Sequence, residues 1–244
     1  MADFDKIFDK DSNDYSGGFK FDRQVANVFE NMISRSVPGY ENVITMSGIL
    51  AEKFVRDNSN CYDLGCSLGA TSLSIQKYLK SKNCRIYAVD NSEAMIERLQ
   101  AILSMSEELP NPIIPVLANI QDIEMTNNAL TAINFTLQFI KIEERMALLE
   151  RIYDSLLPGG VLILSEKIKS EDPAENNLLI DIYHQWKESN GYSKREIEKK
   201  REALENVLIP ESIETHKKRL EQIGFKNFSI WFRCFNFVSM VAFK

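Results

Sequence analysis

Strand-like and helix-like segments alternate through the middle of this 244-residue chain, and that alternation restricts its fold more than any other feature of the sequence. Apolar runs of strand length are separated by amphipathic stretches of helix length. The apolar runs lie at 61–64, 84–90, 113–120, 129–135 and 159–167. Strands that alternate with helices in this way form parallel βαβ units, with helices on both faces of the sheet. The sequence therefore predicts an α/β fold.

Helical patterns without strand signals stand on either side of this alternation. Near the amino end, apolar residues at helical spacing predict one helix that ends at Pro38-Gly39 and a second over 44–55. We interpret 1–55 as a helical cap. Residues 171–215 again contain helical patterns only, so we predict a helical insertion over an edge of the sheet.

Two aromatic-rich strand-like runs close the chain at 228–237 and 238–244. They follow each other without room for a crossover helix, so they must pair as an antiparallel hairpin. Together with the five inner runs they predict a doubly wound, mostly parallel seven-stranded sheet with an antiparallel C-terminal strand. No linker or repeat divides the sequence, and we predict a single domain over 1–244.

Composition excludes several classes of function. The chain has 29 basic and 35 acidic residues, a net charge of −6, which argues against a protein that binds nucleic acid directly. No apolar run is long enough for a signal peptide or a membrane helix, so we expect a cytoplasmic protein without a membrane partner. Four scattered cysteines and two histidines lack the spacing of metal ligands, and we expect no metal.

The strongest local motif is Asp63-Leu64-Gly65-Cys66-Ser67-Leu68-Gly69, where a strand ends and a helix begins. Glycine in such a turn lets main chain approach a ligand closely because it has no Cβ. Strand-to-helix turns also use glycine for structural reasons alone, so the motif by itself leaves both interpretations open.

A second signal lies 27 residues after Asp63, where the next strand ends in Asp90-Asn91. A carboxylate at this place is expected to accept hydrogen bonds from both ribose hydroxyls of an adenosine. A turn or capping role for Asp90 is the structural alternative. Ligands of open parallel sheets bind at the carboxyl ends of the strands, where Gly65, Asp90, Asn119 and Asn134 are expected to lie together.

The turn lacks the G-x-G-x-x-G pattern that binds the pyrophosphate of a dinucleotide, which favours a ligand without phosphates. The antiparallel hairpin predicted at the carboxyl end also argues against a dinucleotide-binding domain. On these residues the chain resembles a class I domain that binds S-adenosyl-L-methionine (SAM).

Six stretches narrow this resemblance to the carboxy-S-adenosyl-L-methionine synthases. They are 37–40 (VPGY), 63–69 (DLGCSLG), 134–139 (NFTLQF), 190–193 (NGYS), 204–207 (LENV) and 231–237 (WFRCFNF). The resemblance implies that SAM and prephenate are converted to carboxy-SAM and phenylpyruvate. Carboxy-SAM then serves a separate tRNA carboxymethyltransferase that modifies the wobble uridine. The resemblance also implies a homodimer.

The resemblance assigns roles to residues of this chain. Gly65, Cys66 and Ser67 line the methionine end of SAM or carboxy-SAM. Asp90 binds the ribose, and Asn91, Asn119 and Ile120 surround the adenine. Asn134 lies beneath the amino-acid portion, and Tyr40 closes the site from the cap, although an aromatic contact between cap and core is an equal alternative for Tyr40. The family usually has aspartate at the position of Asn119.

Arg201 is the implied catalytic residue. It lies in a charged run, 194–201, that by pattern alone indicates a solvated helix face. The resemblance places its guanidinium against the new carboxylate of carboxy-SAM, where bidentate pairing is chemically sensible. Two alternatives remain: a conventional SAM-dependent methyltransferase acting on a small molecule or RNA, and an inactive SAM-binding partner of the tRNA-modifying enzyme.

Overall fold

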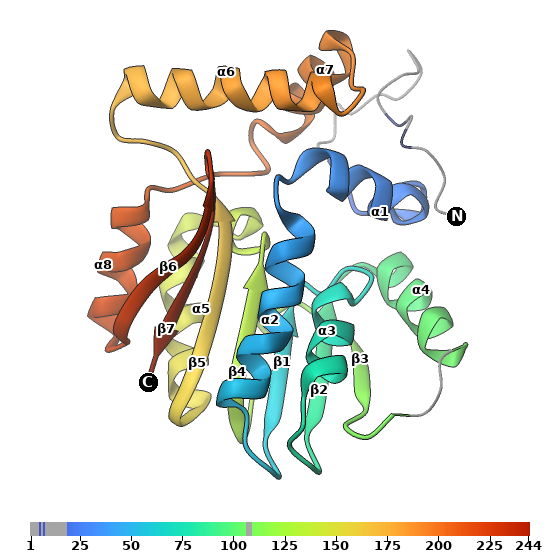
Figure 1. The fold of residues 1–244 in the computed structure, drawn as a ribbon, viewed down its shortest axis with the longest axis vertical. Coiled ribbons are helices and arrows are strands. Elements are labelled where there is room, and N and C mark those ends of the chain that lie inside the picture. Colours follow the sequence, from blue (N-terminus) through green and yellow to red (C-terminus); the bar gives the residue numbers. More distant parts are fainter. Residues whose placement is uncertain (1–4, 6, 8–18, 106–108) are drawn as a thin grey trace.

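The computed structural model describes residue 5, residue 7, and residues 19–105 and 109–244. Its centre is one seven-stranded sheet in the order β3-β2-β1-β4-β5-β7-β6 (Figure 1). The strands are β1 (Asn60–Leu64), β2 (Arg85–Asp90), β3 (Ile113–Leu117), β4 (Asn128–Asn134), β5 (Leu156–Lys167), β6 (Lys226–Cys234) and β7 (Phe237–Phe243). Strands β1 to β5 are parallel, and β7 runs antiparallel between β5 and β6. The predicted doubly wound sheet with an antiparallel C-terminal strand is confirmed.

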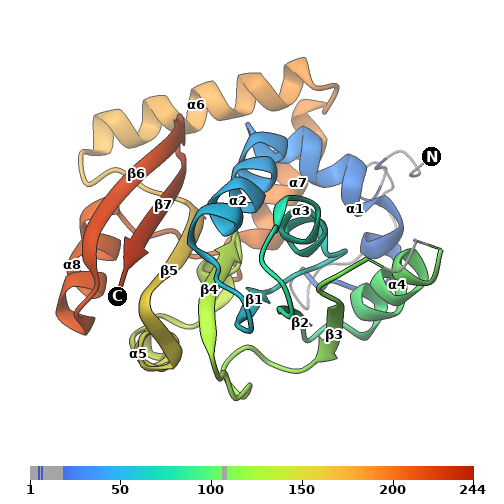
Figure 2. The ribbon, with the colours of Figure 1, turned by 60° about the horizontal axis from the view of Figure 1, so that its bottom comes forward.

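Helices cover both faces of the sheet (Figure 2). The elements are α1 (Arg23–Ser36), α2 (Tyr40–Phe54), α3 (Ala70–Tyr78), α4 (Glu93–Ser104), the 3-10 helix η1 (Leu137–Phe139), α5 (Ile142–Ser155), α6 (Pro173–Ser189), α7 (Lys194–Leu204) and α8 (Ile213–Ile223). Alternating side chains of β1 show how the layers arise. Cys61 packs into the core beneath α2 and α3, whereas Tyr62 and Leu64 pack into the core beneath α5 and α8.

The predicted cap over 1–55 divides into two parts. Helix α2 belongs to the layer beside α3, because Ala51 and Val55 pack with Ile75 in the core of that face. Only α1 lies across the carboxyl ends of the strands, where Phe29 and Met32 pack against Leu68. Most of the segment before Phe19 lies outside the described residues.

The insertion forms α6 and α7, which lie above the strand ends next to α1 (Figure 1). A capping box starts α7. The Ser193 hydroxyl accepts from the main-chain N–H of Glu196, and the Glu196 carboxylate accepts from the main-chain N–H of Ser193. The insertion is shorter than predicted, because Ser212 caps α8, which begins at Ile213. The insertion therefore roofs the place where ligands of such sheets bind.

Candidate functional site

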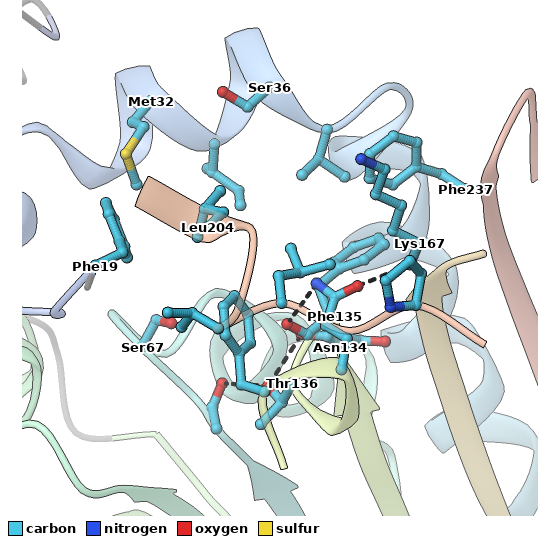
Figure 3. Close-up of a pocket in the computed structure, with 18 of the residues that line it drawn as sticks. Phe19, Met32, Ser36, Ser67, Asn134, Phe135, Thr136, Lys167, Leu204 and Phe237 are labelled. Atoms are coloured by element: carbon cyan, nitrogen blue, oxygen red, sulfur yellow. Dashed lines mark hydrogen bonds between the residues drawn. The ribbon is translucent and has the colours of Figure 1, made fainter. Parts of the chain in front are cut away.

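A cavity of about 910 Å³ lies at the carboxyl ends of the parallel strands, beneath α1, α6 and α7. Its volume is near the upper end of the ~300–1,000 Å³ that small-molecule sites occupy, so a nucleoside-sized ligand leaves room beside it. Figure 3 shows Asn134, Phe135 and Thr136 along its floor and Met32 and Ser36 of α1 on the opposite side. We call it the strand-end cavity.

The turn between β1 and α3 forms part of the floor. Main-chain N–H groups of Gly65 and Cys66 both donate to the carbonyl of Val89, at 2.8 and 2.9 Å. Gly65 has φ +78°, and a Cβ there would lie 2.2 Å from Oγ1 of Thr136. Packing against Thr136 thus requires glycine, which supports the structural interpretation of Gly65. The main chain of Gly65, Cys66 and Ser67 nevertheless lines the cavity, as expected.

Asp90 ends β2 and lines the same cavity. Its Oδ2 accepts from the main chain of Ser67 and its Oδ1 from that of Ser92, each at 2.9 Å. Burial raises the pKa of Asp90, and these N–H groups oppose that shift. A carboxylate has about four lone-pair positions, so each oxygen of Asp90 can still accept a hydroxyl. The site therefore fits the two ribose hydroxyls of an adenosine.

Asn119 is the one predicted residue that does not line the cavity. Its Nδ2 donates to Asp122 Oδ2 at 2.9 Å, which orients the amide so that Oδ1 accepts from Asn91 at 3.2 Å. Asn119 therefore holds Asn91, which does line the cavity. Ile120, which follows it, is buried at the cavity wall.

Asn134 and Tyr40 also line the cavity. Asn134 is fixed at both ends of its amide: Nδ2 donates to Thr71 Oγ1 at 3.0 Å, and Oδ1 accepts from Ser165 Oγ at 2.7 Å. The Tyr40 ring lies 6.2 Å from that of Phe135, and burial raises the pKa of Tyr40. Tyr40 therefore packs against the core as the structural alternative expects, and it also faces the cavity.

Arg201 occupies the last turn of α7 and lines the cavity. Among the described residues its ion-pair partner is Glu198, 3.8 Å from Nη1 on the same helix, and the Arg201 side chain is 60% exposed. Exposed pairs of this kind are weak. The guanidinium can therefore exchange Glu198 for a ligand carboxylate at little cost. The roles predicted for all these residues stay predictions.

Sequence reasoning missed three lysines of the cavity, Lys167, Lys187 and Lys200. Lys167 ends β5, so it stands at the same sheet edge as Asp90, and the strand-end rule alone would have found it. Lys187 and Lys200 lie in charged helices, where nothing in the sequence distinguishes a cavity-facing lysine from a solvated one.

Among the described residues, no group of histidine, cysteine, aspartate or glutamate side chains is arranged to hold a metal ion. None of the helices in that part of the chain is both long and apolar enough to cross a bilayer.

Comparison with known structures shows the fold. A putative O-methyltransferase from Nostoc punctiforme superposes with a TM-score of 0.63 at 13% identity, covering 98% of this chain and 69% of that one. A putative SAM-dependent methyltransferase from Methanococcus maripaludis superposes with a TM-score of 0.56 at 20% identity, covering 92% and 94%. A family model described as a methyltransferase domain matches residues 62–160.

Comparison with curated proteins gives the family. The carboxy-S-adenosyl-L-methionine synthase of Vibrio parahaemolyticus is 52% identical over 95% of this chain and 94% of its own length. The synthase of Vibrio atlanticus is 49% identical over the whole of both chains, and that of Citrifermentans bemidjiense 52% over 93% of each. The chain therefore belongs to the carboxy-S-adenosyl-L-methionine synthase family.

Proposed function

We propose that this protein converts SAM and prephenate to carboxy-SAM and phenylpyruvate. The supporting observation is the extent of the match. The methyltransferase-domain model stops at residue 160, whereas a relative named carboxy-SAM synthase is 49% identical over the whole chain. The match thus includes α6 and α7, which bring Arg201 to the cavity.

The cavity offers SAM a binding site along its floor. Asp90 would accept both ribose hydroxyls, with Asn91 and Ile120 next to the adenine. The main chain of Cys66 and Ser67 would line the methionine end, and Asn134 would lie beneath the amino-acid group. The free lone pairs of Asp90 and the fixed amide of Asn134 support this orientation.

The proposed reaction balances without an oxidant. Prephenate loses carbon dioxide and its ring hydroxyl as it becomes phenylpyruvate. The hydroxide takes a proton from the methyl group of SAM and leaves as water, and the methyl carbon forms a bond to the carbon dioxide. The sulfonium charge makes that methyl proton acidic, so no protein base is required. The contribution of the protein is to align both substrates and exclude water under α1, α6 and α7.

Arg201 would then bind the carboxylate that the reaction creates. For Arg201→Ala we expect SAM affinity to stay within about two-fold of wild type, because SAM lacks that carboxylate. Affinity for carboxy-SAM should fall by about 30-fold or more, as for the loss of a charge partner. Isothermal titration with each compound measures both. Equal affinity of the variant and wild type for carboxy-SAM would remove Arg201 from the site.

Mass spectrometry of an incubation with SAM and prephenate tests the proposal directly. The expected product is heavier than SAM by one carboxyl group and accumulates with phenylpyruvate. S-Adenosylhomocysteine as the sole product would support a conventional methyltransferase. SAM binding without turnover would support an inactive binding partner.

The resemblance also leads us to propose a homodimer in the cytoplasm, whose product supplies a separate tRNA carboxymethyltransferase. Sedimentation velocity of the purified chain tests the dimer, and a single species at the monomer mass would refute it.

A further inference from the structure

Two lysine side chains, Lys167 and Lys187, line the strand-end cavity together with Asn134. Lys167 ends β5, and Lys187 comes from α6 in the roof. Their Nζ atoms lie 4.8 and 4.7 Å from the centroid of the same aromatic ring, that of Tyr183. Two cations that do not follow each other in sequence are thus gathered around one ring. Figure 3 shows the Lys167 side chain reaching up beside Phe237.

Among the residues that the structure describes, none pairs directly with these two ammonium groups, although the Asp5 carboxylate acts on Lys187 from a distance. Neither makes an ion pair or a side-chain hydrogen bond with another described residue. Asp181 and Glu205 also line the cavity, but neither pairs with them. Lys187 is only 5% exposed, so its charge has lost most of its hydration. A buried cation without a partner is costly and points to an anion that binds there.

The surrounding charges have the same sign. Burial, and then the charge of Arg201, lower the pKa of Lys167 to about 8. Burial also lowers the pKa of Lys187, helped by Lys200 and Lys167 and opposed by Asp5. Burial lowers the pKa of Lys200 to about 8, opposed by Asp5, but this lysine already donates to Ser36 Oγ at 2.8 Å. Besides Arg201, Lys167 and Lys187 are therefore the described cations of the cavity that are left for a ligand.

The walls between the lysines are aromatic. The Tyr183 ring lies 5.2 Å from that of Phe237, which lies 6.1 Å from Phe135. Tyr183 is held in place because its hydroxyl donates to the carbonyl of Ser36 at 2.8 Å. The rings are tilted by 57° and 64° to one another, so they form an aromatic wall next to the two cations, which suits a carbon ring that carries carboxylates.

We propose that Lys167, Lys187, Phe135, Tyr183 and Phe237, which we call the lysine subsite, bind a ring-bearing dicarboxylate substrate beside SAM, with its carboxylates on the two ammonium groups. The proposal rests on the proposed function, in which that substrate is prephenate. Asn134 pairs in register with Ser165, two residues before Lys167 on β5, so a dicarboxylate at Lys167 would lie next to the methionine portion of SAM that Asn134 is proposed to hold.

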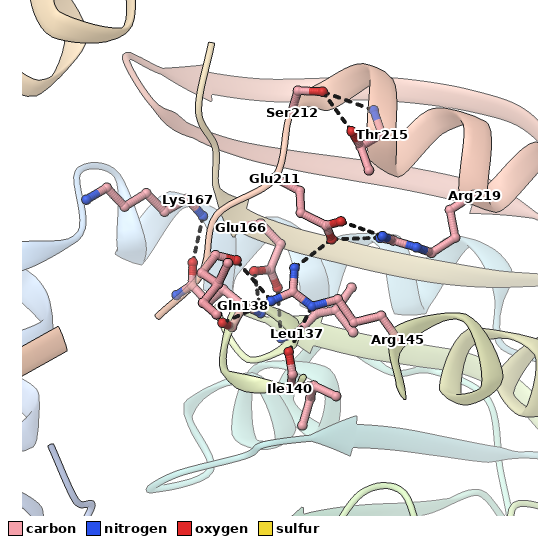
Figure 4. A network of polar contacts seen from close by, with 11 residues as sticks. Leu137, Gln138, Ile140, Arg145, Glu166, Lys167, Glu211, Ser212, Thr215 and Arg219 are labelled. Atoms are coloured by element: carbon pink, nitrogen blue, oxygen red, sulfur yellow. Dashed lines mark hydrogen bonds and ion pairs between the residues drawn. The ribbon is translucent and has the colours of Figure 1, made fainter. Parts of the chain in front are cut away.

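A buried polar network holds Lys167 at this place (Figure 4). The main-chain N–H of Lys167 donates to Gln138 Oε1 at 3.0 Å. The neighbouring Glu166 carboxylate accepts from the main chain of Leu137 and Gln138, at 3.0 and 2.9 Å. Arg145 closes the network by donating to the carbonyl of Gln138 at 3.2 Å. The lysine therefore projects from a rigid strand end.

The test is direct binding, because binding does not depend on turnover. Phenylpyruvate and prephenate are titrated calorimetrically into protein saturated with S-adenosylhomocysteine. For Lys167→Gln and Lys187→Gln we expect the dissociation constant for prephenate to rise by about 30-fold or more, with SAM affinity within two-fold of wild type. Phenylpyruvate has one carboxylate, so its affinity should fall less. Lys169→Gln, an exposed lysine two residues after Lys167, is the matched control and should bind like wild type.

Prephenate affinities within two-fold of wild type in both variants would overturn the proposal, and so would an equal loss of SAM affinity. Lys187→Met tests whether a loss of binding reflects misfolding: removal of a desolvated cation should leave the melting temperature at or above that of wild type while prephenate binding is lost.

If wild type binds prephenate at the lysine subsite but forms no carboxy-SAM, the proposed function fails and the subsite stands. If wild type forms carboxy-SAM and the lysine variants bind prephenate normally, only the subsite fails.

Discussion

At the scale of single residues, Gly65 shows how a ligand motif and a packing requirement coincide. Gly65→Ala adds a Cβ at φ +78° that would lie 2.2 Å from Thr136 Oγ1. We expect about 3 kcal/mol loss of unfolding free energy, roughly 1 from the left-handed backbone and the rest from overpacking. Urea unfolding measures it. Gly159→Ala is the matched control, because Gly159 has the same φ of +78° with nothing within 4 Å of its Cβ, and it should lose only about 1 kcal/mol. Equal losses would contradict the clash.

Lys167 gives the site a pH dependence. Its pKa in the folded protein is about 8, and an anion binds to the protonated form. Prephenate affinity should therefore be highest below about pH 7 and fall roughly ten-fold between pH 7 and pH 9 as Lys167 loses its proton. Lys187, whose pKa burial also lowers, adds to the fall. Calorimetry across this range measures it, and Lys167→Gln should flatten the profile; an unchanged slope in that variant would exclude Lys167 as the titrating group.

The same pKa shift of Lys167 makes the free energy of unfolding rise with pH, whereas prephenate affinity falls. Because the folded-state pKa of Lys167 lies below its ordinary value of 10.5, the unfolded chain binds more protons between about pH 8 and 10.5. The contribution of this group to stability is thus a penalty below pH 8 that disappears as the pH rises through that window.

The residues that sequence reasoning found are those whose position follows from topology. Asp90 was predictable because a strand end fixes where its carboxylate lies. Asn119 was assigned to the ligand by resemblance, yet its amide is engaged by Asp122 and Asn91, a side-chain geometry that spacing does not reveal. Lys187 was not predictable, because which face of α6 turns inwards depends on the packing of Tyr183 against Phe237.

At the scale of elements, the return of the chain from α7 to α8 depends on Arg145. This side chain is fully buried, donates to the carbonyls of Ile140 and Ile209 at 2.9 Å, and pairs with Glu211 at 2.6 Å. Arg145→Met leaves these acceptors without their donor, and we expect a loss of about 3–5 kcal/mol. Hydrogen exchange should show faster exchange at 207–212 together with the lower urea midpoint.

A matched control separates burial from charge in that experiment. Lys218 pairs with Glu214 at 3.5 Å on the exposed side of α8. Lys218→Met should change stability by no more than about 0.5 kcal/mol, because exposed ion pairs contribute little. If both variants lose the same stability, the Arg145 network does not hold the return segment.

The helices themselves were predictable from periodicity, but their layers were not. Residues 44–55 have the apolar spacing of a helix, and that spacing is equally compatible with a cap or with a layer of the sheet. The assignment is decided by Ala51 and Val55 packing with Ile75, a contact between segments that periodicity does not join. The antiparallel hairpin was predictable because its two strands are adjacent in sequence and leave no alternative connection.

At the scale of the whole molecule, charge is distributed unevenly. The chain carries a net charge of −6, yet Lys167, Lys187, Lys200 and Arg201 all line one cavity. A small dianion can enter such a cavity, whereas a folded nucleic acid is too large to do so. Polyanion binding depends on exposed basic stripes that release counterions, and three lysines beneath α1, α6 and α7 with the single exposed Arg201 do not provide one.

This distribution leads to the prediction that carboxy-SAM is made without tRNA. The rate of carboxy-SAM formation should be the same with and without added tRNA, and fluorescence anisotropy with labelled tRNA should show no saturable binding at micromolar protein and about 150 mM salt, where non-specific complexes are weak. Phenylpyruvate is the control, since an aromatic carboxylate small enough for the lysine subsite should compete with prephenate where tRNA does not. Saturable micromolar tRNA binding that slows the reaction would mean that the cationic cavity is open to a polymer, and the closed roof inferred from α6 and α7 would then be wrong.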